Sequence, residues 1–448
     1  MDASIAGIQE GVTDALNREA VDRVAQGEPG WLRERRENAW SVYERTPLPT
    51  TKLEEWRYTD LSKKLDLDPL ALQPREERPL APEAFPPALR QAMDADWDSA
   101  GELVEVDGAV VHNRLQEELA ARGVVFTSLR KAVESHPEIL QQHLATEALP
   151  AEDGKFQALN AALWSDGALL YIPRGVRVDL PIRVTRWLSE AGLACFTRTL
   201  VVAEQGSQVS FVDEILSEEL ESQSLFNTGV EIVAHADAQV QYVSLQRMGR
   251  GPFHLLQQKT LAHKDATLNT LNINLGASVA RVDLTSRLLE AGAQSDMLGL
   301  YFAQDDQHFD HNTSQNHVAG NTWSDLLYKG ALDDEARAVF RGIIRVFEGA
   351  QQTDAYQTNR NLLLSEEARA DSLPNLEIEA DDVKCSHGAT VGQLDRDHLF
   401  YLMSRGIPRK QAERLVVIGF LGEILQRLPL GGVVEKVKGI IEEKLGHG

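Results

Sequence analysis

The sequence predicts a mainly β protein whose core is a β-helix, with α-helical domains at both ends. Two observations carry this prediction. Residues 103–375 form a series of short runs rich in Val, Leu, Thr and Phe, separated by small or acidic residues. Several of these runs resemble one another at a spacing of roughly 30 residues, which is typical of a stacked solenoid. We therefore expect each coil to bury its inner face on its neighbours.

The clearest repeats are VVAEQGSQVSFV (201–212), IVAHADAQVQYV (232–243) and TLAHKDATLNTL (260–271). Each combines an apolar pair, a polar corner and an alternating strand. Weaker copies of the pattern follow. The equivalent apolar positions are Val202, Val233, Leu261, Leu289, Leu332 and Leu364. Neighbouring positions in this series are 31, 28, 28, 43 and 32 residues apart.

A large β-sandwich is the alternative architecture, because its strands also alternate and recur. Hairpin turn pairs such as Asn-Gly or Asp-Gly between adjacent strands are scarce in this sequence. A solenoid needs only a corner between strands, so the pattern favours the β-helix.

The N-terminal part is predicted to be helical. Apolar residues fall near helical spacing over residues 5–45, with a break at Gly27 to Gly30 and an end before Pro47. Residues 66–99 are rich in Pro and Ala and are expected to form a connector with short helical pieces. The predicted divisions are 1–102 for the helical domain and connector, 103–390 for the β-helix, and 391–448 for a C-terminal helical domain.

Two helices are predicted in the tail. Asp395 can cap the first, which runs to about Arg405 and stops at Gly406, and Pro408 starts the second, which continues to about Leu428. This second helix carries an apolar stripe that either packs on its own domain or docks another protein. The stripe consists of Leu415, Ile418, Leu421, Leu425 and Leu428.

Composition excludes several classes of function. The 68 acidic residues outnumber the 45 basic ones, giving a formal net charge of −23, and there is no dense Lys/Arg run, so we expect no nucleic acid partner. The start lacks an export signal, and no apolar run reaches the length of a membrane span. Two widely separated cysteines are typical of a reducing compartment. We therefore expect a cytoplasmic protein with no membrane association.

Cys385 and His387 are the most informative pair of residues. If residues 383–391 form a strand, Val383, Cys385, His387, Ala389 and Val391 share one, mostly apolar, face. One interpretation is a buried thiol beside a hydrogen-bonded core histidine. The other is a pair of metal ligands. Closed metal sites usually need about four ligands. The only other cysteine is far away in sequence, so a metal-binding pair would need ligands from another subunit.

Other candidate chemistry is sparse. His308, His311 and His317 form the densest histidine cluster; they predict either a polar strand face or, with Asp310, a mononuclear metal site. The sequence contains no G-x-x-x-x-G-K-[ST] loop, H-E-x-x-H or G-x-S-x-G motif. We therefore expect no ATP site and no enzymatic activity. Cys195 is expected to be buried and inert.

Three long blocks resemble the SufB/SufD family of iron–sulfur cluster assembly proteins. They are PLPTTKLEEWRYTDL (47–61), YKGALDDEARAVFRGIIRV (328–346) and the segment from DAYQTNRN to FYLMSRGI (354–407). Within the last block, KCSHGATVG (384–392) is most similar to the SufD branch of the family. The resemblance spans most of the chain.

This resemblance implies a right-handed parallel β-helix between N-terminal and C-terminal helical domains. It implies a scaffold that pairs with a SufB-like subunit and with a SufC-like ABC ATPase, which the C-terminal helices contact. A transient iron–sulfur cluster would form at the interface of the two scaffold subunits. His387 would contribute to it, and Cys385 would matter less. The resemblance leaves open whether a flavin takes part.

Two alternatives are kept. A SufB-like homodimeric scaffold is one, and a homodimer is also expected when the partner is absent. A carbohydrate-active β-helix enzyme is the other, although such enzymes are usually secreted and no export signal is present.

Overall fold

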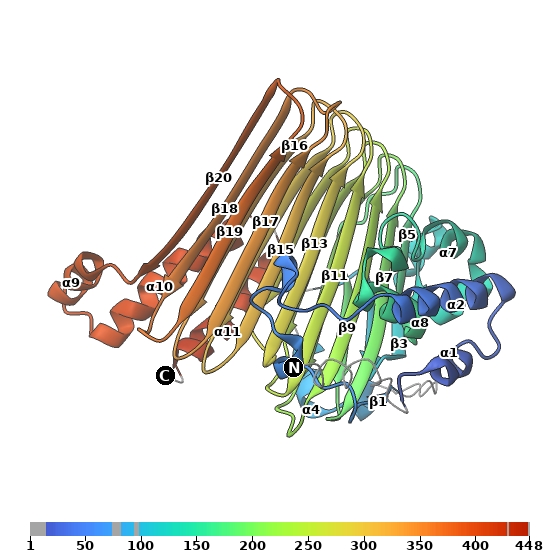
Figure 1. Ribbon diagram of the computed structural model, residues 1–448, viewed down its shortest axis with the longest axis horizontal. Coiled ribbons are helices and arrows are strands. Elements are labelled where there is room, and N and C mark those ends of the chain that lie inside the picture. Colours follow the sequence, from blue (N-terminus) through green and yellow to red (C-terminus); the bar gives the residue numbers. More distant parts are fainter. Residues whose placement is uncertain (1–14, 74–81, 94–97, 428–429, 447–448) are drawn as a thin grey trace, which may run out of the picture.

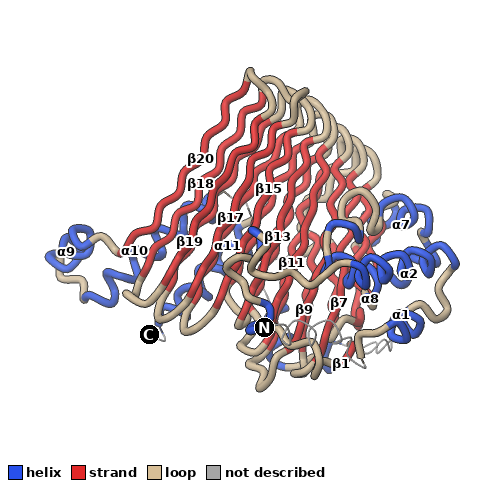
Figure 2. The backbone as a smooth tube through the Cα atoms, in the orientation of Figure 1, coloured by secondary structure: helices blue, strands red, loops and turns tan. Residues whose placement is uncertain are grey.

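The computed structural model describes residues 15–73, 82–93, 98–427 and 430–446. In this part of the chain, two ten-stranded sheets face each other and form a parallel β-solenoid (Figures 1 and 2). Successive long strands alternate between the sheets, so each coil contributes one strand to each. The β-helix prediction is therefore confirmed, and the sandwich alternative is wrong, because the long strands pair in parallel with the coil before and the coil after.

The first sheet has the strand order β19-β17-β15-β13-β11-β9-β7-β5-β4, and β1 pairs with β7. Its strands are β1 (Ala71–Leu72), β4 (Val125–Ser128), β5 (Asp166–Ile172), β7 (Leu193–Ala203), β9 (Ser224–Ala234), β11 (Pro252–Ala262), β13 (Val279–Leu288), β15 (His308–His317), β17 (Arg337–Val346) and β19 (Arg369–Ile378).

The second sheet has the strand order β20-β18-β16-β14-β12-β10-β8-β6-β2-β3. Its strands are β2 (Gly101–Val106), β3 (Ala109–Leu115), β6 (Ile182–Leu188), β8 (Gln208–Ser217), β10 (Gln239–Arg247), β12 (Thr267–Asn274), β14 (Gln294–Ala303), β16 (Trp323–Leu332), β18 (Thr353–Leu363) and β20 (Val383–Gln393).

The sequence repeat corresponds to strand register for three coils only. Val233 pairs with Val202 on one side and with Leu261 on the other, as predicted. The next partner of Leu261 is Arg287, so the position predicted at Leu289 is two residues too late. The echo at Leu332 lies in the second sheet, on β16, and pairs with Leu363. The later part of the predicted repeat is therefore wrong, because it mixes strands from the two sheets.

The corners explain the acidic residues between the runs. Asp237, Asp265, Asp305 and Asp334 follow β9, β11, β14 and β16, and all four have positive φ angles, between 51° and 60°. Aspartate tolerates this left-handed conformation better than most residues, because its short side chain can bond locally. The left-handed backbone conformation of these corners therefore explains why aspartate occupies them.

Helical layers cover the outer faces of both sheets. The N-terminal layer rests on the first sheet through a core that joins Leu32, Trp40 and Leu159 to Phe196 and Leu200 of β7. Its helices are α1 (Arg18–Val24), α2 (Gly30–Arg45), α3 (Leu61–Lys64), α6 (Leu129–Ser135), α7 (Pro137–His143) and α8 (Lys155–Leu163), with short 3₁₀ turns η2 (Glu54–Trp56) and η4 (Ala151–Asp153). The turn η3 (Pro82–Ala84) precedes α4 (Pro87–Met93), which packs on β2, β3, β6 and β8 of the second sheet, and α5 (Glu117–Ala121) contributes Leu119 to the core between the sheets. The predicted break near Gly27 is confirmed between α1 and α2, while the start of the predicted segment, 5–14, lies outside the described residues.

The C-terminal layer consists of α9 (Arg396–Ser404), α10 (Arg409–Gln426) and α11 (Gly431–Gly446). α10 and α11 cover the second sheet, and α9 packs on α10. Asp395 accepts hydrogen bonds from the backbone of Asp397 and His398, as a helix cap does, and Gly406 has the left-handed φ of 86° that ends α9. These features confirm the predicted bounds of the first tail helix. In Figure 1, α9 projects beyond β20 at the C-terminal end of the solenoid.

Candidate functional site

The solenoid ends on two open strands. β19 and β20 are the last strands of the first and second sheet, and each pairs with one neighbour only, β17 and β18 respectively. β20 is exposed along most of its eleven residues, whereas the strands of the middle coils are largely buried. In the described part of the chain nothing covers this end, so the main-chain groups on the free side of β20 are available to another molecule.

Cys385 and His387 lie on this open strand. Cys385 pairs with Ala355 of β18, and His387 pairs with Gln357. Both β18 residues are buried between the two sheets, so the alternation of the strand turns Cys385 and His387 toward the solenoid interior. The predicted strand and the shared face of the pair agree with this structure. His387 is exposed because no further coil lies beyond it.

The surroundings of the pair are more polar than the sequence indicated. The neighbouring row on β18 continues from Gln357 to Asn359 and Asn361, all buried. Asn361 donates to Asn359 Oδ1 over 2.7 Å, whereas neither side-chain polar atom of Gln357 has a partner. The strand face that carries the pair is mostly apolar, as predicted, and β18 adds buried amides beside His387.

The donor set at this end is incomplete. Cys385 packs at the margin of a small apolar cluster, and burial raises the pKa of its thiol, with the nearby Asp354 carboxylate adding to the effect. Within the described residues, no three His, Cys, Asp or Glu side chains come together in an arrangement that could hold a metal ion. Two potential donors, one thiol and one imidazole, therefore lie at the open end of the solenoid, and the described part of the chain brings no third donor to them.

The histidines of β15 form hydrogen bonds inside the fold. His308 Nε2 lies 2.9 Å from Thr59 Oγ1, and Asn274 Nδ2 donates to His311 Nε2 over 3.0 Å. His317 contacts two hydroxyl groups, at 2.7 and 2.8 Å. Burial lowers the pKa of all three to about 4, which keeps them neutral. The three histidines therefore form a polar strand face, the first of the two predicted interpretations. Asp310, the carboxylate of the alternative metal site, forms an ion pair with Arg281.

A buried ionic network was not found by sequence reasoning. Arg186 on β6 lies between Glu105 of β2 and Asp213 of β8, with its Nε 2.8 Å from Asp213 Oδ1. All three side chains are buried. Burial raises the pKa of Glu105 to about 7, although Arg186 opposes this shift. The only available signal was the pair of arginines inside the apolar strand IRVTRWL.

The predicted stripe on α10 divides into two parts. Leu421 and Leu425 are buried with Val243, Leu271 and other residues of the second sheet, so they attach α10 to its own chain. Ile418 is half-buried, and Leu428 lies outside the described residues. Leu415 is 45% exposed. The structure therefore leaves Leu415, and in part Ile418, available to a partner.

The exposed apolar side chains of the tail gather on α9. Phe400 is 74% exposed, Tyr401 58% and Met403 44%. α9 packs on α10, which carries Leu415. Sequence reasoning did not identify these three residues, although FYLM inside a capped helix was a visible signal.

Cys195 is fully buried in β7, and burial raises its thiol pKa well above the ordinary value. Cys195 and Cys385 are both free thiols. In the part of the chain that the structure describes, we find no helix with the length and apolar character needed to cross a membrane.

Comparison with known proteins assigns most of the chain. Residues 186–420 match the family described as "SUF system FeS cluster assembly, SufBD core domain", and residues 14–184 match "SufBD protein N-terminal region". The iron–sulfur cluster assembly protein SufD of Bacillus subtilis is 30% identical over 93% of this chain and 95% of its own length. SufBD family proteins of Staphylococcus saprophyticus and Staphylococcus epidermidis are 28% identical over 97% of this chain and 93% of theirs. The chain therefore belongs to the SufB/SufD family of iron–sulfur cluster assembly proteins and is similar to its SufD branch.

Proposed function

We propose that this chain is a SufD-like scaffold subunit that pairs with a SufB-like subunit and with an ABC-type ATPase similar to SufC. A nascent iron–sulfur cluster, the cargo of the complex, would form where the two scaffold subunits meet. In this proposal the chain binds and positions, and catalyses no reaction itself. Its free thiols and lack of a disulfide between the two cysteines support a reducing, cytoplasmic location.

The open end of the solenoid carries this proposal. A long, exposed edge strand is a template for pairing with another chain, and natural proteins usually cover or interrupt such edges. Here β20 is eleven residues long, is exposed and ends its sheet. A second scaffold subunit that pairs with β20 would extend the sheet and cover the face of Cys385 and His387. A second copy of this chain is the alternative occupant when that subunit is absent.

The incomplete donor set supports a site shared between two chains. Iron–sulfur clusters are commonly held by about four Cys or His ligands, and this end of the chain offers one exposed imidazole and one half-buried thiol. His387 is the more accessible donor. The raised pKa of Cys385 disfavours its thiolate, the form that binds metal, until a cation is nearby. We therefore assign the main role to His387.

The test is anaerobic co-purification of this chain with candidate SufB and SufC subunits, comparing native protein with His387→Ala. We expect the complex to assemble in both cases, but His387→Ala to lose most of its iron and its cluster absorbance. Ser386→Ala is the matched control, because Ser386 lies on the opposite face of the same strand.

Two outcomes would contradict the proposal at different points. Unchanged iron content in His387→Ala would remove this residue from the cluster site while leaving the scaffold role. Failure of the native chain to associate with either subunit would refute the pairing itself.

The ATPase contact is proposed on α9 and the adjacent part of α10. Phe400, Tyr401, Met403 and Leu415 form the exposed apolar surface of the tail, and we call these four residues the tail patch. Large exposed aromatic side chains are typical anchors of protein interfaces. Because Leu421 and Leu425 attach α10 to the second sheet, force on the tail patch would be transmitted to the solenoid. ATP-dependent movement of the ATPase would then shift the scaffold through differential binding to two states.

Phe400→Asp tests the tail patch. Burying a new charge in the centre of an apolar contact should weaken ATPase binding by about 2 kcal/mol or more, which pull-down or calorimetric titration would measure. Leu180→Asp is the control, because Leu180 is an exposed leucine just before β6, at the opposite end of the second sheet from β20 and α9. Equal affinity of both variants would place the ATPase contact elsewhere.

A further inference from the structure

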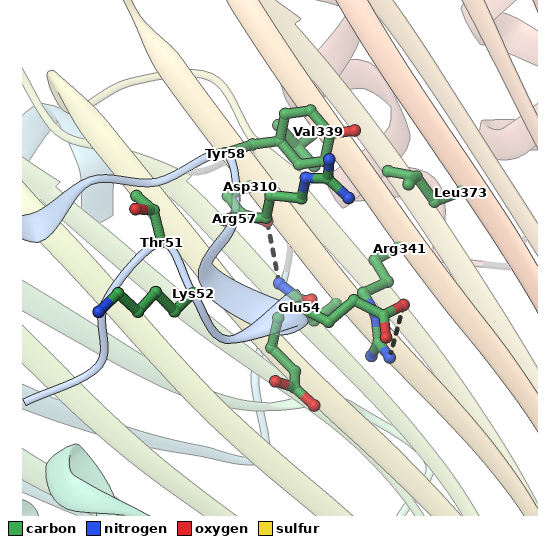
Figure 3. Close-up of a pocket in the computed structure, with 11 residues that line it drawn as sticks. Thr51, Lys52, Glu54, Arg57, Tyr58, Asp310, Val339, Arg341 and Leu373 are labelled. Atoms are coloured by element: carbon green, nitrogen blue, oxygen red, sulfur yellow. Dashed lines mark hydrogen bonds and ion pairs between the residues drawn. The ribbon is translucent and has the colours of Figure 1, made fainter. Parts of the chain in front are cut away.

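A cavity of about 480 Å³ lies between the segment 51–58 and the outer face of the first sheet (Figure 3). Its size is in the range of small-molecule sites. One wall comes from the turn η2 and its flanking residues, and the other from β15, β17 and β19. The wall segment is part of the block 47–61, which the scaffold function does not otherwise use.

The wall segment is held firmly on the sheet. Trp56 is buried, and the guanidinium of Arg281 lies over its ring, 3.6 Å from the centroid. The same guanidinium donates to the Glu55 carbonyl oxygen over 2.8 Å and to Asp310 Oδ2 over 2.7 Å. Thr59 Oγ1 also donates to Asp310. These contacts shape the cavity before any ligand arrives, which reduces the entropy lost on binding.

The floor of the cavity has polar atoms without partners. Asn312 donates through Nδ2 to Asp310 Oδ1 over 2.9 Å, while its Oδ1 is buried and has no partner. Arg341 Nε is also buried without a partner. The Arg341 contact with Glu54 is long, at 3.5 Å, and Glu54 is mostly exposed. Buried polar groups are normally satisfied, so one donor and one acceptor here are available to a ligand.

The rim adds positive charge. Lys52 and Arg57 line the cavity, and neither forms an ion pair within the described residues. Three carboxylates also line the cavity. Asp310 forms an ion pair with Arg281, and Glu54 forms a long one with Arg341. Glu55 is the lining carboxylate for which the described residues show no ion pair. The overall charge of −23 repels anions at long range, so an anion would need local donors of this kind.

We propose that this cavity binds a small ligand with a phosphate or carboxylate group. Arg341 would hold the oxyanion through its unpartnered Nε, and Arg57 would contribute a second positive charge from the rim, because the planar guanidinium suits both phosphate and carboxylate. Asn312 Oδ1 would accept a hydrogen bond from a ligand hydroxyl. Tyr58, Val339 and Leu373 offer apolar surface to the remainder of the ligand. Leu373 lies on β19, so the occupied cavity would contact the open end of the first sheet. The inference does not depend on the proposed scaffold function.

The test is calorimetric titration of the full chain with pyrophosphate and, separately, with citrate, at matched ionic strength. We expect at least one probe to bind, and Arg57→Gln and Arg341→Gln each to weaken it by about tenfold or more, the loss typical of a charge-assisted contact. Arg345→Gln is the control, because Arg345 lies four residues along the same strand but pairs with Glu377 outside the cavity. Thermal unfolding of each variant checks that it is folded.

The two probes distinguish the source of the oxyanion. Binding of pyrophosphate alone identifies a phosphorylated ligand, and binding of citrate alone a carboxylated one. No binding of either probe, or equal affinity in native protein and both cavity variants, overturns the proposal. An equal loss in Arg345→Gln would show nonspecific attraction to surface arginines and would also overturn it.

Discussion

Replacement of Arg186 by Met is expected to lower the free energy of unfolding by about 3–5 kcal/mol, because it leaves buried carboxylates without their counterion. Arg186 contacts Glu105 and Asp213 at once, and its Nη2 donates to Thr199 Oγ1 over 2.6 Å. A methionine fills a similar volume but donates no hydrogen bond. The network joins β2, β6 and β8, so its loss would loosen the N-terminal coils first.

Urea unfolding measures this loss. Arg345→Met is the matched control, because Arg345 forms an ion pair with Glu377 in which both side chains are more than 40% exposed; exposed pairs contribute at most about 1 kcal/mol. Arg186→Lys, which keeps the charge, should lie between native protein and Arg186→Met. Equal unfolding midpoints for Arg186→Met and Arg345→Met would refute the structural role of the network.

Acidification is expected to destabilise the chain strongly between pH 6.5 and 4. Burial lowers the pKa of His308, His311 and His317 to about 4 and that of His254 to about 3. In the unfolded chain these histidines titrate near 6.5. The unfolded state therefore binds more protons within this window, so stability is fully present above pH 6.5 and is lost as the pH falls through the folded pKa values.

The expected size of this effect is large. A displacement of about 2.5 pKa units corresponds to roughly 3 kcal/mol per histidine. Glu105 and Asp166 act in the opposite direction, because burial raises their pKa values to about 7 and about 6, so the folded state takes up these two protons first and offsets part of the loss. The net loss from four histidines remains comparable to the stability of a typical domain. Urea unfolding at pH 7.5 and 4.5 would measure the difference.

His254→Leu should flatten the pH profile. Neither ring nitrogen of His254 has a partner, so leucine also removes buried unsatisfied polar atoms at neutral pH. His398→Leu is the control, because His398 is exposed on α9 and loses little hydration on folding. A pH profile for His254→Leu with the native slope would contradict the assignment of proton uptake to buried histidines.

Most of the fold could be predicted from the sequence, because a solenoid repeats a local sequence pattern. Val202, Val233 and Leu261 mark neighbouring coils, and their spacing alone predicts the stacking. The extension to Leu332 fails because a spacing does not say which of two sheets a strand joins. That choice depends on where each corner turns, and corners differ in length.

The candidate site was predictable only in part. Strand alternation correctly placed Cys385 and His387 on one face, because this property is local. The amides beside them come from β18, about thirty residues earlier, and register across coils cannot be read from the pair itself. Likewise, helical spacing identified Leu415 and Leu421 together, but only the packing of α10 on the second sheet separates the exposed residue from the buried one.

The position of β20 has a consequence for local stability. In a stacked array each coil is stabilised by the interfaces with its neighbours, so a middle coil gains two interfaces and the last coil only one. The last coil should therefore unfold locally more often than the other coils, and its backbone amides should be the first to exchange hydrogen with solvent. Cys385 and His387 thus lie on a strand that only one neighbour anchors, and the partner that adds the missing interface would also fix the geometry of the two donors.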